Sequence, residues 1–209
     1  ILFTMLNKKN QLIQDLIEHT AQLASAGMTP ATSSNFSARL DNAHCLITVS
    51  GRDKGKLNAD DFMEISMDGI AVDAKQTSSA ETLLHTQIYQ LRPEANIVLH
   101  THSLAQTLMS MRYEQDGKIE FTGYELQKAF VGIKSHDGTV SLPIVANSQN
   151  MNVLCESVQA LFAQDNFWGY LIAGHGIYTW GRDMIEARRH LDAFEFLLQA
   201  ELAKLSYKL

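Results

Sequence analysis

Residues 96–108 read NIVLHTHSLAQTL, an apolar run that ends in two histidines one residue apart and continues into a helix-like pattern. The apolar run predicts a buried strand, and the spacing after Ser103 predicts a helix. Alternate residues of a strand point to the same side, so His100 and His102 project together at the end of the strand. Open α/β sheets place their ligands at strand ends, which makes this pair the first candidate for a site.

The spacing alone is weak evidence, because eight histidines in 209 residues give an H-x-H pair about 0.3 times by chance. The alternative is a pair of hydrogen-bonded histidines without a ligand. His175, in LIAGHGIYTWG, is the candidate third ligand. Glycine on both sides removes Cβ bulk and lets its imidazole approach an ion held by another strand. Three neutral imidazoles leave an open coordination position, the arrangement of a catalytic zinc site.

The other histidines and the cysteines lack such a context. We interpret His44, His85, His136 and His190 as surface or packing residues. Cys45 and Cys155 lie far apart in the sequence among apolar residues, which favours reduced core thiols over a disulfide or a cysteine metal site.

Composition narrows the class of protein. A chain of 209 residues with 45% hydrophobic and 19% charged residues is long enough for one well-buried core, and we expect a single domain over residues 1–209. A net charge of -6 and the lack of a basic tract argue against nucleic acid or an anionic membrane as partner. No apolar run approaches the ~20 residues of a membrane span, and the opening residues do not resemble a signal peptide, so we expect a cytoplasmic protein.

Periodicity predicts alternating helices and strands. Helices are expected over residues 12–23, 80–91, 103–111 and 151–164, around 124–130 and over 184–205, the second capped by Ser79. Strands are expected over residues 44–50, 96–102, 139–145, 169–173 and 176–180, with a hairpin around Asp68-Gly69. The stretch PATSSNFSARL, residues 30–40, reads as polar loop. The pattern indicates an α/β layered domain with a mixed or largely antiparallel sheet.

Five motifs then occur in a familiar order. They are SSNFSAR (33–39), TVSGRDKG (48–55), SSAETLLHTQIY (78–89), IVLHTHS (97–103) and GHGIYTWG (174–181). The chain resembles the class II aldolase/epimerase superfamily over nearly its whole length. SGRDKGKL, ELQKAF and GHGIYTWG are most similar to the bacterial methylthioribulose-1-phosphate dehydratases of methionine salvage.

The resemblance implies a three-layer α/β/α fold, a homotetramer with sites near subunit interfaces, and one Zn²⁺ per subunit on His100, His102 and His175. It also implies a sugar-phosphate substrate. The residues that match the phosphate-binding segments of relatives are Ser34, Asn35, Ser50, Gly51, Ser78 and Ser79. Lys54 either adds charge nearby or, more often for such a residue, is an ordinary exposed lysine. Hydroxyls, backbone N-H groups and a helix N-terminus are suitable donors to an anion. Relatives commonly have glycine where this chain has Ser34, so close backbone approach is not expected there.

Two carboxylates compete for the acid/base role. Glu81 matches the position that supplies the acid/base carboxylate in the aldolases, and Glu125 matches the catalytic glutamate of the dehydratases. The resemblance therefore implies zinc-dependent dehydration of 5-methylthioribulose 1-phosphate, with Glu125 moving protons and Glu81 orienting substrate or solvent. The alternatives are a fuculose-phosphate-type aldolase or epimerase, which needs Glu81, and a non-catalytic scaffold like the adducin head, in which the metal triad would be broken. Tyr178 is either a contact for a methylthio group or, more often for such a residue, part of the core.

Overall fold

The computed structural model describes residues 2–73, 78, 79, 81–163 and 167–207. Its centre is an eight-stranded sheet in the order β3-β2-β1-β4-β8-β7-β6-β5. The strands are β1 (Asn35–Arg39), β2 (His44–Thr48), β3 (Phe62–Ser66), β4 (Ile97–Thr101), β5 (Lys118–Thr122), β6 (Thr139–Val145), β7 (Gly169–Ile172) and β8 (Gly176–Gly181). Among the described strand pairs only β6 and β7 run parallel. The expected mixed, largely antiparallel sheet is confirmed.

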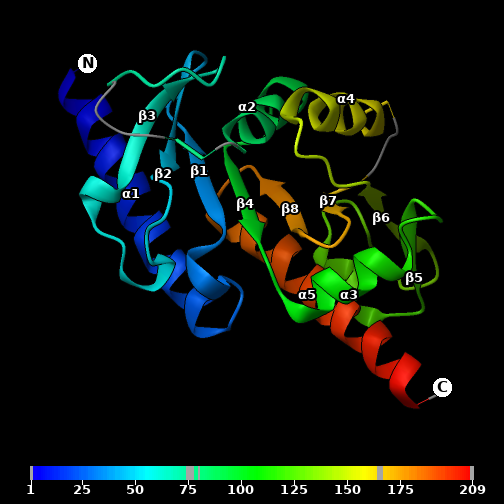
Figure 1. Cartoon of the computed structure of the whole chain (residues 1–209). Helices are drawn as coiled ribbons and strands as arrows, with labels where there is room; N and C mark the ends of the chain where they lie inside the picture. Colours follow the sequence, from blue (N-terminus) through cyan, green and yellow to red (C-terminus); the bar gives the residue numbers. More distant parts are fainter. Residues whose placement is uncertain (1, 74–77, 80, 164–166, 208–209) are drawn as a thin grey trace.

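Helices cover both faces of the sheet (Figure 1). Helices α2 (Thr82–Leu91) and α4 (Met151–Leu161) lie on one face, and α1 (Leu2–Ser25), α3 (Leu104–Arg112) and α5 (Met184–Tyr207) lie on the other. Short 3-10 turns complete the chain: η1 (Pro30–Thr32), η2 (Lys54–Lys56), η3 (Ala59–Asp61) and η4 (Glu125–Ala129). This is the expected three-layer α/β/α arrangement.

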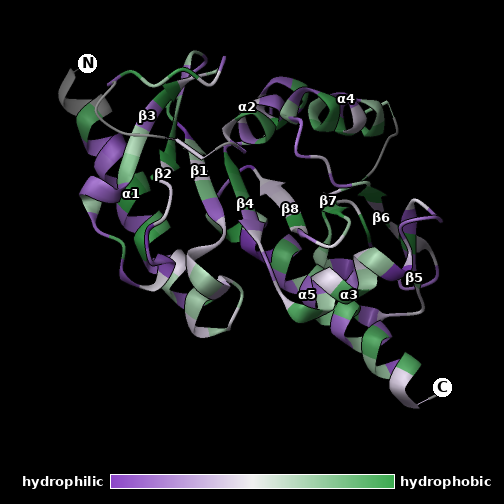
Figure 2. Cartoon of the chain, viewed as in Figure 1, coloured by the Kyte–Doolittle hydropathy of each residue, from purple (hydrophilic) through white to green (hydrophobic). Residues whose placement is uncertain are grey.

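Strand β4 connects the two hydrophobic cores. Ile97 and Leu99 pack in the core beneath α1, α3 and α5, whereas Val98 packs in the core beneath α2 and α4. Figure 2 shows the strand as hydrophobic over its first part and hydrophilic toward its end. Because side chains alternate, His100 follows Val98 onto the α2/α4 side. The apolar run thus anchors the strand and delivers the histidine to one defined face.

The polar stretch of residues 30–40 differs from the expectation of a loop, because it contains β1. Phe36 and Ala38 are fully buried in the core beneath α1, α3 and α5. Asn35 and Ser37 are also buried, on the side of α2, where polar side chains accept or donate hydrogen bonds. The strand was missed because its polar residues have buried partners that the sequence does not display.

Other boundaries also shift. Helix α2 begins at Thr82, and the Ser79 hydroxyl accepts the N-H of Glu81 at 3.3 Å, so Ser79 caps the preceding turn and is not the N-cap of the helix. Strand β5 was not expected, and the predicted hairpin is reduced to β3 and one bridge between Ile65 and Ala71. The short helix expected around ELQKAF is present as the 3-10 helix η4.

The described helices contain no segment with the length and hydropathy needed to cross a bilayer.

Gly176 provides a test of the tight packing between β4 and β8. A Cβ at this position would lie 2.2 Å from the Thr101 carbonyl oxygen and 3.1 Å from the His100 ring. We expect Gly176→Ala to lower the free energy of unfolding by about 1 to 3 kcal/mol, because a backbone atom cannot move aside cheaply. Chemical denaturation measures the difference. Gly138→Ala is the matched control, since nothing lies within 4 Å of its added Cβ; equal stability of the two variants would contradict the packing argument.

Candidate metal centre and adjoining hollows

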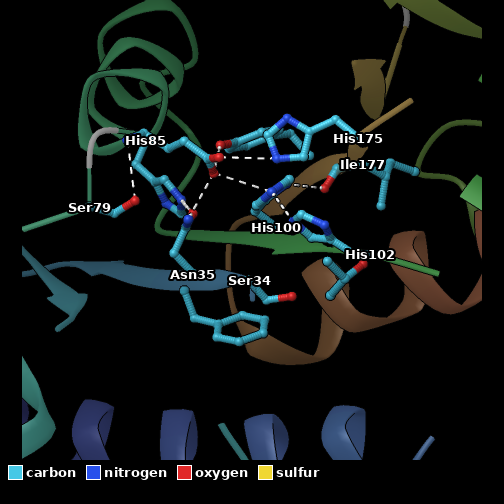
Figure 3. Close-up of polar contacts among 12 residues, drawn as sticks. Ser34, Asn35, Ser79, His85, His100, His102, His175 and Ile177 are labelled. Atoms are coloured by element: carbon cyan, nitrogen blue, oxygen red, sulfur yellow. Dashed lines mark hydrogen bonds and ion pairs between the residues drawn. The ribbon is translucent and has the colours of Figure 1, made fainter. Parts of the chain in front are cut away.

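The structure brings the three candidate histidines together (Figure 3). His100 lies in β4, His102 directly after it, and His175 in the turn between β7 and β8. One ring nitrogen from each can be chosen so that the three lie within 4.8 Å of one another. His102 and His175 are 73 positions apart in the chain. They converge because β4 and β8 are hydrogen-bonded neighbours.

The donor set fits a metal ion. His100 Nδ1 lies 2.9 Å from the Ile177 carbonyl oxygen, so this nitrogen carries the proton and Nε2 presents its lone pair to the cluster. His102 Nε2 lies 2.8 Å from that same Nε2. Burial lowers the pKa of His100 well below its usual value and that of His102 to about 4, although Glu81 opposes the shift. Neutral imidazoles with converging lone pairs are what a divalent transition metal binds.

Glu81 adds a carboxylate to the cluster. Its Oε2 lies 3.2 Å from His100 Nε2 and its Oε1 lies 3.0 Å from His175 Nε2. Oε2 also accepts hydrogen bonds of 2.8 Å from the Asn35 amide and the Tyr178 hydroxyl. Burial raises the pKa of the Glu81 carboxyl, but His100, His175 and Asn35 outweigh burial and hold that pKa well below its usual range. The carboxylate is therefore ionised near neutral pH.

Tyr178 supports the cluster from β8. Its ring stacks on His100 with centroids 4.1 Å apart and on Tyr170 with centroids 5.1 Å apart. Burial raises the pKa of Tyr178 well above its usual value, so its hydroxyl stays protonated and donates to Glu81. The interpretation of Tyr178 as a core residue is correct for its ring, but its hydroxyl belongs to the site.

A hollow of about 160 Å³ opens on one side of the cluster. It gathers six of the seven residues expected to bind phosphate, along with Glu81 and His102. These six are Ser34, Asn35, Ser50, Gly51, Lys54 and Ser79, and Ser78 is not among the lining residues. Segments that are up to 45 residues apart in the chain thus meet in one donor-rich cavity.

Two residues of this hollow differ from their expected state. The Ser34 hydroxyl donates to the Met28 carbonyl oxygen at 3.2 Å, so its proton is already used. Ser34 also has a φ of 76°, in the left-handed region that favours glycine. Lys54 is buried, and its ammonium donates to the carbonyl oxygens of Thr32 and Arg52 at 3.2 and 2.8 Å. Lys54 is therefore not an ordinary exposed lysine.

A second hollow, of about 390 Å³, opens elsewhere along the same cluster. It shares Glu81 and His102 with the first hollow and adds His175. Its remaining walls are Asn147, Ser148, Gln149, Met151, Leu154 and Gly174. The sequence did not indicate Asn147, Ser148 and Gln149, because the loop before α4 carries no recognisable motif.

Glu125 is not brought to the cluster within this chain. It lies at the exposed start of η4, where it pairs with Lys128 and lies 3.5 Å from His136. It lines neither of the two hollows. The carboxylate nearest to the histidines in the described part of the chain is Glu81.

The remaining histidines and cysteines divide as follows. His190 is a buried residue of α5 that donates to the Trp180 carbonyl oxygen, and His136 is exposed. His85 is fully buried and hydrogen-bonded to Asn35, so packing alone does not describe it. Both cysteines are free; Cys45 is buried, which raises the pKa of its thiol to about 12, and Cys155 is half-buried.

The fold and the histidine cluster define a member of the class II aldolase and adducin N-terminal domain family. The model of that family matches residues 14–202, and the chain belongs to it. Solved structures of the same fold include the L-fuculose-1-phosphate aldolase of Thermus thermophilus, with 22% identity, a TM-score of 0.76, and 96% of this chain and 98% of that chain covered. A putative aldolase/epimerase/decarboxylase of Klebsiella pneumoniae has 20% identity and a TM-score of 0.80, with 94% and 90% covered.

Curated relatives are more similar in sequence. The methylthioribulose-1-phosphate dehydratase of Stenotrophomonas maltophilia strain R551-3 is 56% identical over 193 residues, which cover 92% of this chain and 91% of the relative. The protein of that name from Xanthomonas campestris pv. campestris strain 8004 is 54% identical over 199 residues, with 95% and 92% covered.

Removal of one imidazole tests the metal centre. We expect His175→Ala to reduce bound divalent metal well below one ion per chain, because two histidines alone hold such an ion weakly. Elemental analysis after dialysis against excess metal measures the content. His136→Ala removes an exposed histidine outside the cluster and is expected to leave the content unchanged. Full metal content in the His175 variant would exclude His175 from the centre.

Proposed function

We propose that this chain is a zinc-dependent hydro-lyase of methionine salvage that converts 5-methylthioribulose 1-phosphate into 2,3-diketo-5-methylthiopentyl 1-phosphate. The observation that carries the proposal is the three-histidine cluster beside a donor-rich hollow, in a chain 54–56% identical to curated dehydratases over most of its length. An intact triad also argues against a non-catalytic scaffold.

Zinc is the metal we infer for His100, His102 and His175. Three neutral imidazoles and an open position are typical of catalytic Zn²⁺, whereas Mg²⁺ and Ca²⁺ prefer oxygen ligands. Bound there, the ion would supply a Lewis acid for the carbonyl of the substrate. Side chains of the protein would orient the substrate and transfer its protons.

The two hollows support an orientation for the substrate. The phosphate fits the first hollow, where the hydroxyls of Ser50 and Ser79 and the ammonium of Lys54 lie close together. The carbonyl at C2 would then lie near the histidines. The methylthio end extends into the second hollow, whose wall includes the apolar side chains of Met151 and Leu154.

Dehydration removes a proton from C3 and hydroxide from C4, and the resulting enol becomes the 3-ketone. A carboxylate must accept the first proton, and a protonated group must assist the departing hydroxide. Glu81 is ionised and held by Asn35 and Tyr178, which suits it to orient the substrate or solvent. The proton transfer itself we assign to Glu125.

Because Glu125 lies outside the hollows of its own chain, we propose that it reaches the site of a neighbouring subunit in a homotetramer. Its side chain is exposed and free to face a second copy. Helix α3, which begins two residues after His102, exposes Leu104, Leu108 and Met111 along one side. Such an unpartnered apolar stripe beside the cluster is suited to a subunit contact.

One observation favours a second candidate, a sugar-phosphate aldolase or epimerase. Glu81 contacts His100 and His175 within the chain, which is the place where an aldolase needs its acid/base carboxylate. Both reactions pass through an enediolate at C2 and C3, which forms by loss of the C3 proton in the dehydration and by cleavage of the C3–C4 bond in the aldol cleavage. The fold and the histidines therefore do not separate them. The two reactions differ in their products and in the carboxylate that carries the proton.

The products distinguish the two functions. We expect zinc-loaded protein to form the diketone from 5-methylthioribulose 1-phosphate and to release no dihydroxyacetone phosphate from fuculose 1-phosphate, with both products followed by mass spectrometry. The dephosphorylated methylthioribulose should react poorly, because the first hollow offers its donors to an anion. Aldol cleavage without diketone formation would establish the alternative.

The two glutamates give the sharper prediction. Gln keeps the shape of Glu but cannot accept a proton, so Glu125→Gln should lower kcat by about 10² to 10⁴ while zinc is retained. Glu81→Gln should be the milder change if it only orients. Glu120→Gln, on the exposed side of β5, is the matched control and should leave kcat unchanged. The aldolase function predicts the reverse ranking of Glu81 and Glu125, with zinc intact in both variants.

A further inference from the structure

A row of polar side chains on one side of helix α2 faces strand β1. Glu81, His85 and Tyr89 follow one another at intervals of four residues, so they share one side of the helix. Asn35 and Ser37 are alternate residues of β1 and share one side of the strand. His85, Ser37 and Tyr89 are at most 1% exposed, so each of their polar groups requires a partner.

These five residues form one unbroken chain of hydrogen bonds. The Tyr89 hydroxyl lies 2.7 Å from Ser37 Oγ, which lies 2.7 Å from His85 Nδ1. His85 Nε2 bonds Asn35 Oδ1. The Asn35 amide nitrogen then donates to Glu81 Oε2 at 2.8 Å. Figure 3 shows the end of this chain, from His85 through Asn35 toward the histidine cluster.

The orientation of the Asn35 amide sets the direction of every bond. Its NH₂ donates to Glu81 Oε2, and its Oδ1 faces His85 Nε2. An amide oxygen only accepts, so the His85 Nε2 must carry the proton. His85 Nδ1 then accepts from Ser37, whose oxygen in turn accepts from Tyr89.

The reverse direction is unfavourable. If His85 carried its proton on Nδ1, the Asn35 amide would turn its NH₂ toward the ring and its oxygen toward Glu81. Two acceptors would then face each other without a proton between them, in a buried site where an unmade bond to a charged group is costly. Burial also keeps His85 neutral, since it lowers the pKa of that ring to about 3 even though Glu81 opposes the shift.

We propose that His85 is a positioning residue: its Nε2 proton holds the Asn35 amide in the orientation that donates to Glu81. Asn35 and Tyr178 together hold Oε2, so the carboxylate keeps one rotamer beside the histidines. His85 itself lies outside both hollows and contacts none of the candidate ligands by hydrogen bond. Its effect on turnover rests on the proposed function, whereas its tautomer does not.

Two substitutions at position 85 distinguish the role of the hydrogen-bond donor from that of the side-chain volume. His85→Leu keeps an apolar side chain in the core but leaves Asn35 without its donor, and we expect kcat on 5-methylthioribulose 1-phosphate to fall about 10- to 100-fold. His85→Gln places an amide N-H near the former Nε2 and should restore most of the loss. Metal content should change little in both variants, since the three candidate ligands His100, His102 and His175 are unchanged.

Thr86→Val is the matched control. Thr86 is buried in the same helix, and its hydroxyl bonds only the Leu83 carbonyl oxygen of its own turn. We expect it to lose some stability and no kcat. Equal kcat losses in His85→Leu and Thr86→Val, or no recovery in His85→Gln when both variants are folded, would overturn the positioning role.

The tautomer of His85 can be measured directly by NMR, without an activity assay. In ¹⁵N-histidine-labelled, zinc-loaded protein, the His85 signals are assigned by their disappearance in His85→Gln. We expect a neutral ring protonated on Nε2. A ring protonated on Nδ1, or an imidazolium, would overturn the proposal. Failure of the wild type to form the diketone would instead overturn the proposed function, and the tautomer would still decide the role of His85.

Discussion

The structure of the site depends on one half-buried carboxylate. Glu81 accepts hydrogen bonds from Asn35 on β1 and Tyr178 on β8, and it lies within 3.2 Å of nitrogens of His100 and His175. An ionised carboxylate removed from water is costly unless such donors surround it. Elements that are distant in the chain must therefore be placed correctly before Glu81 can be buried, and the same placement assembles the three histidines.

The sheet makes that placement possible. In the order β1-β4-β8, strand β4 is the central neighbour, with Asn35 opposite His100 and Tyr178 opposite His100 on its other side. A slip of one residue in the pairing would turn every side chain of a strand to the opposite face. The register of the antiparallel pairs therefore determines that these residues face the site. The apolar residues of β4 thus determine the geometry of its polar end. Gly176, which approaches the Thr101 carbonyl, lets β8 come close enough to complete the cluster.

Sequence reasoning predicted the parts that repeat a pattern and missed those that depend on a partner. The strand before His100, the helix after Ser103 and the long C-terminal helix follow from periodicity, and the H-x-H pair followed from its place at a strand end. Strand β1 was missed because Asn35 and Ser37 look like loop residues until α2 supplies their hydrogen bonds. The four-residue spacing of Glu81, His85 and Tyr89 was the signal that could have revealed that contact. The phosphate residues came from family resemblance, since no local rule joins segments so far apart.

The position of the two carboxylates explains how one centre can serve two reactions. Glu81 is built into the fold, since it precedes α2 directly and contacts both Asn35 of β1 and the histidines. Glu125 lies on an exposed turn, where its position is set by what packs against that turn. Under the proposed function, a member of this family can keep the histidine cluster and its enediolate chemistry constant while a residue on the outer surface changes the fate of the intermediate. On the proposed function, assembly of subunits is then part of the catalytic site itself, because the fold of one chain supplies the cluster and the carboxylate that orients the substrate, and a second copy supplies the proton carrier.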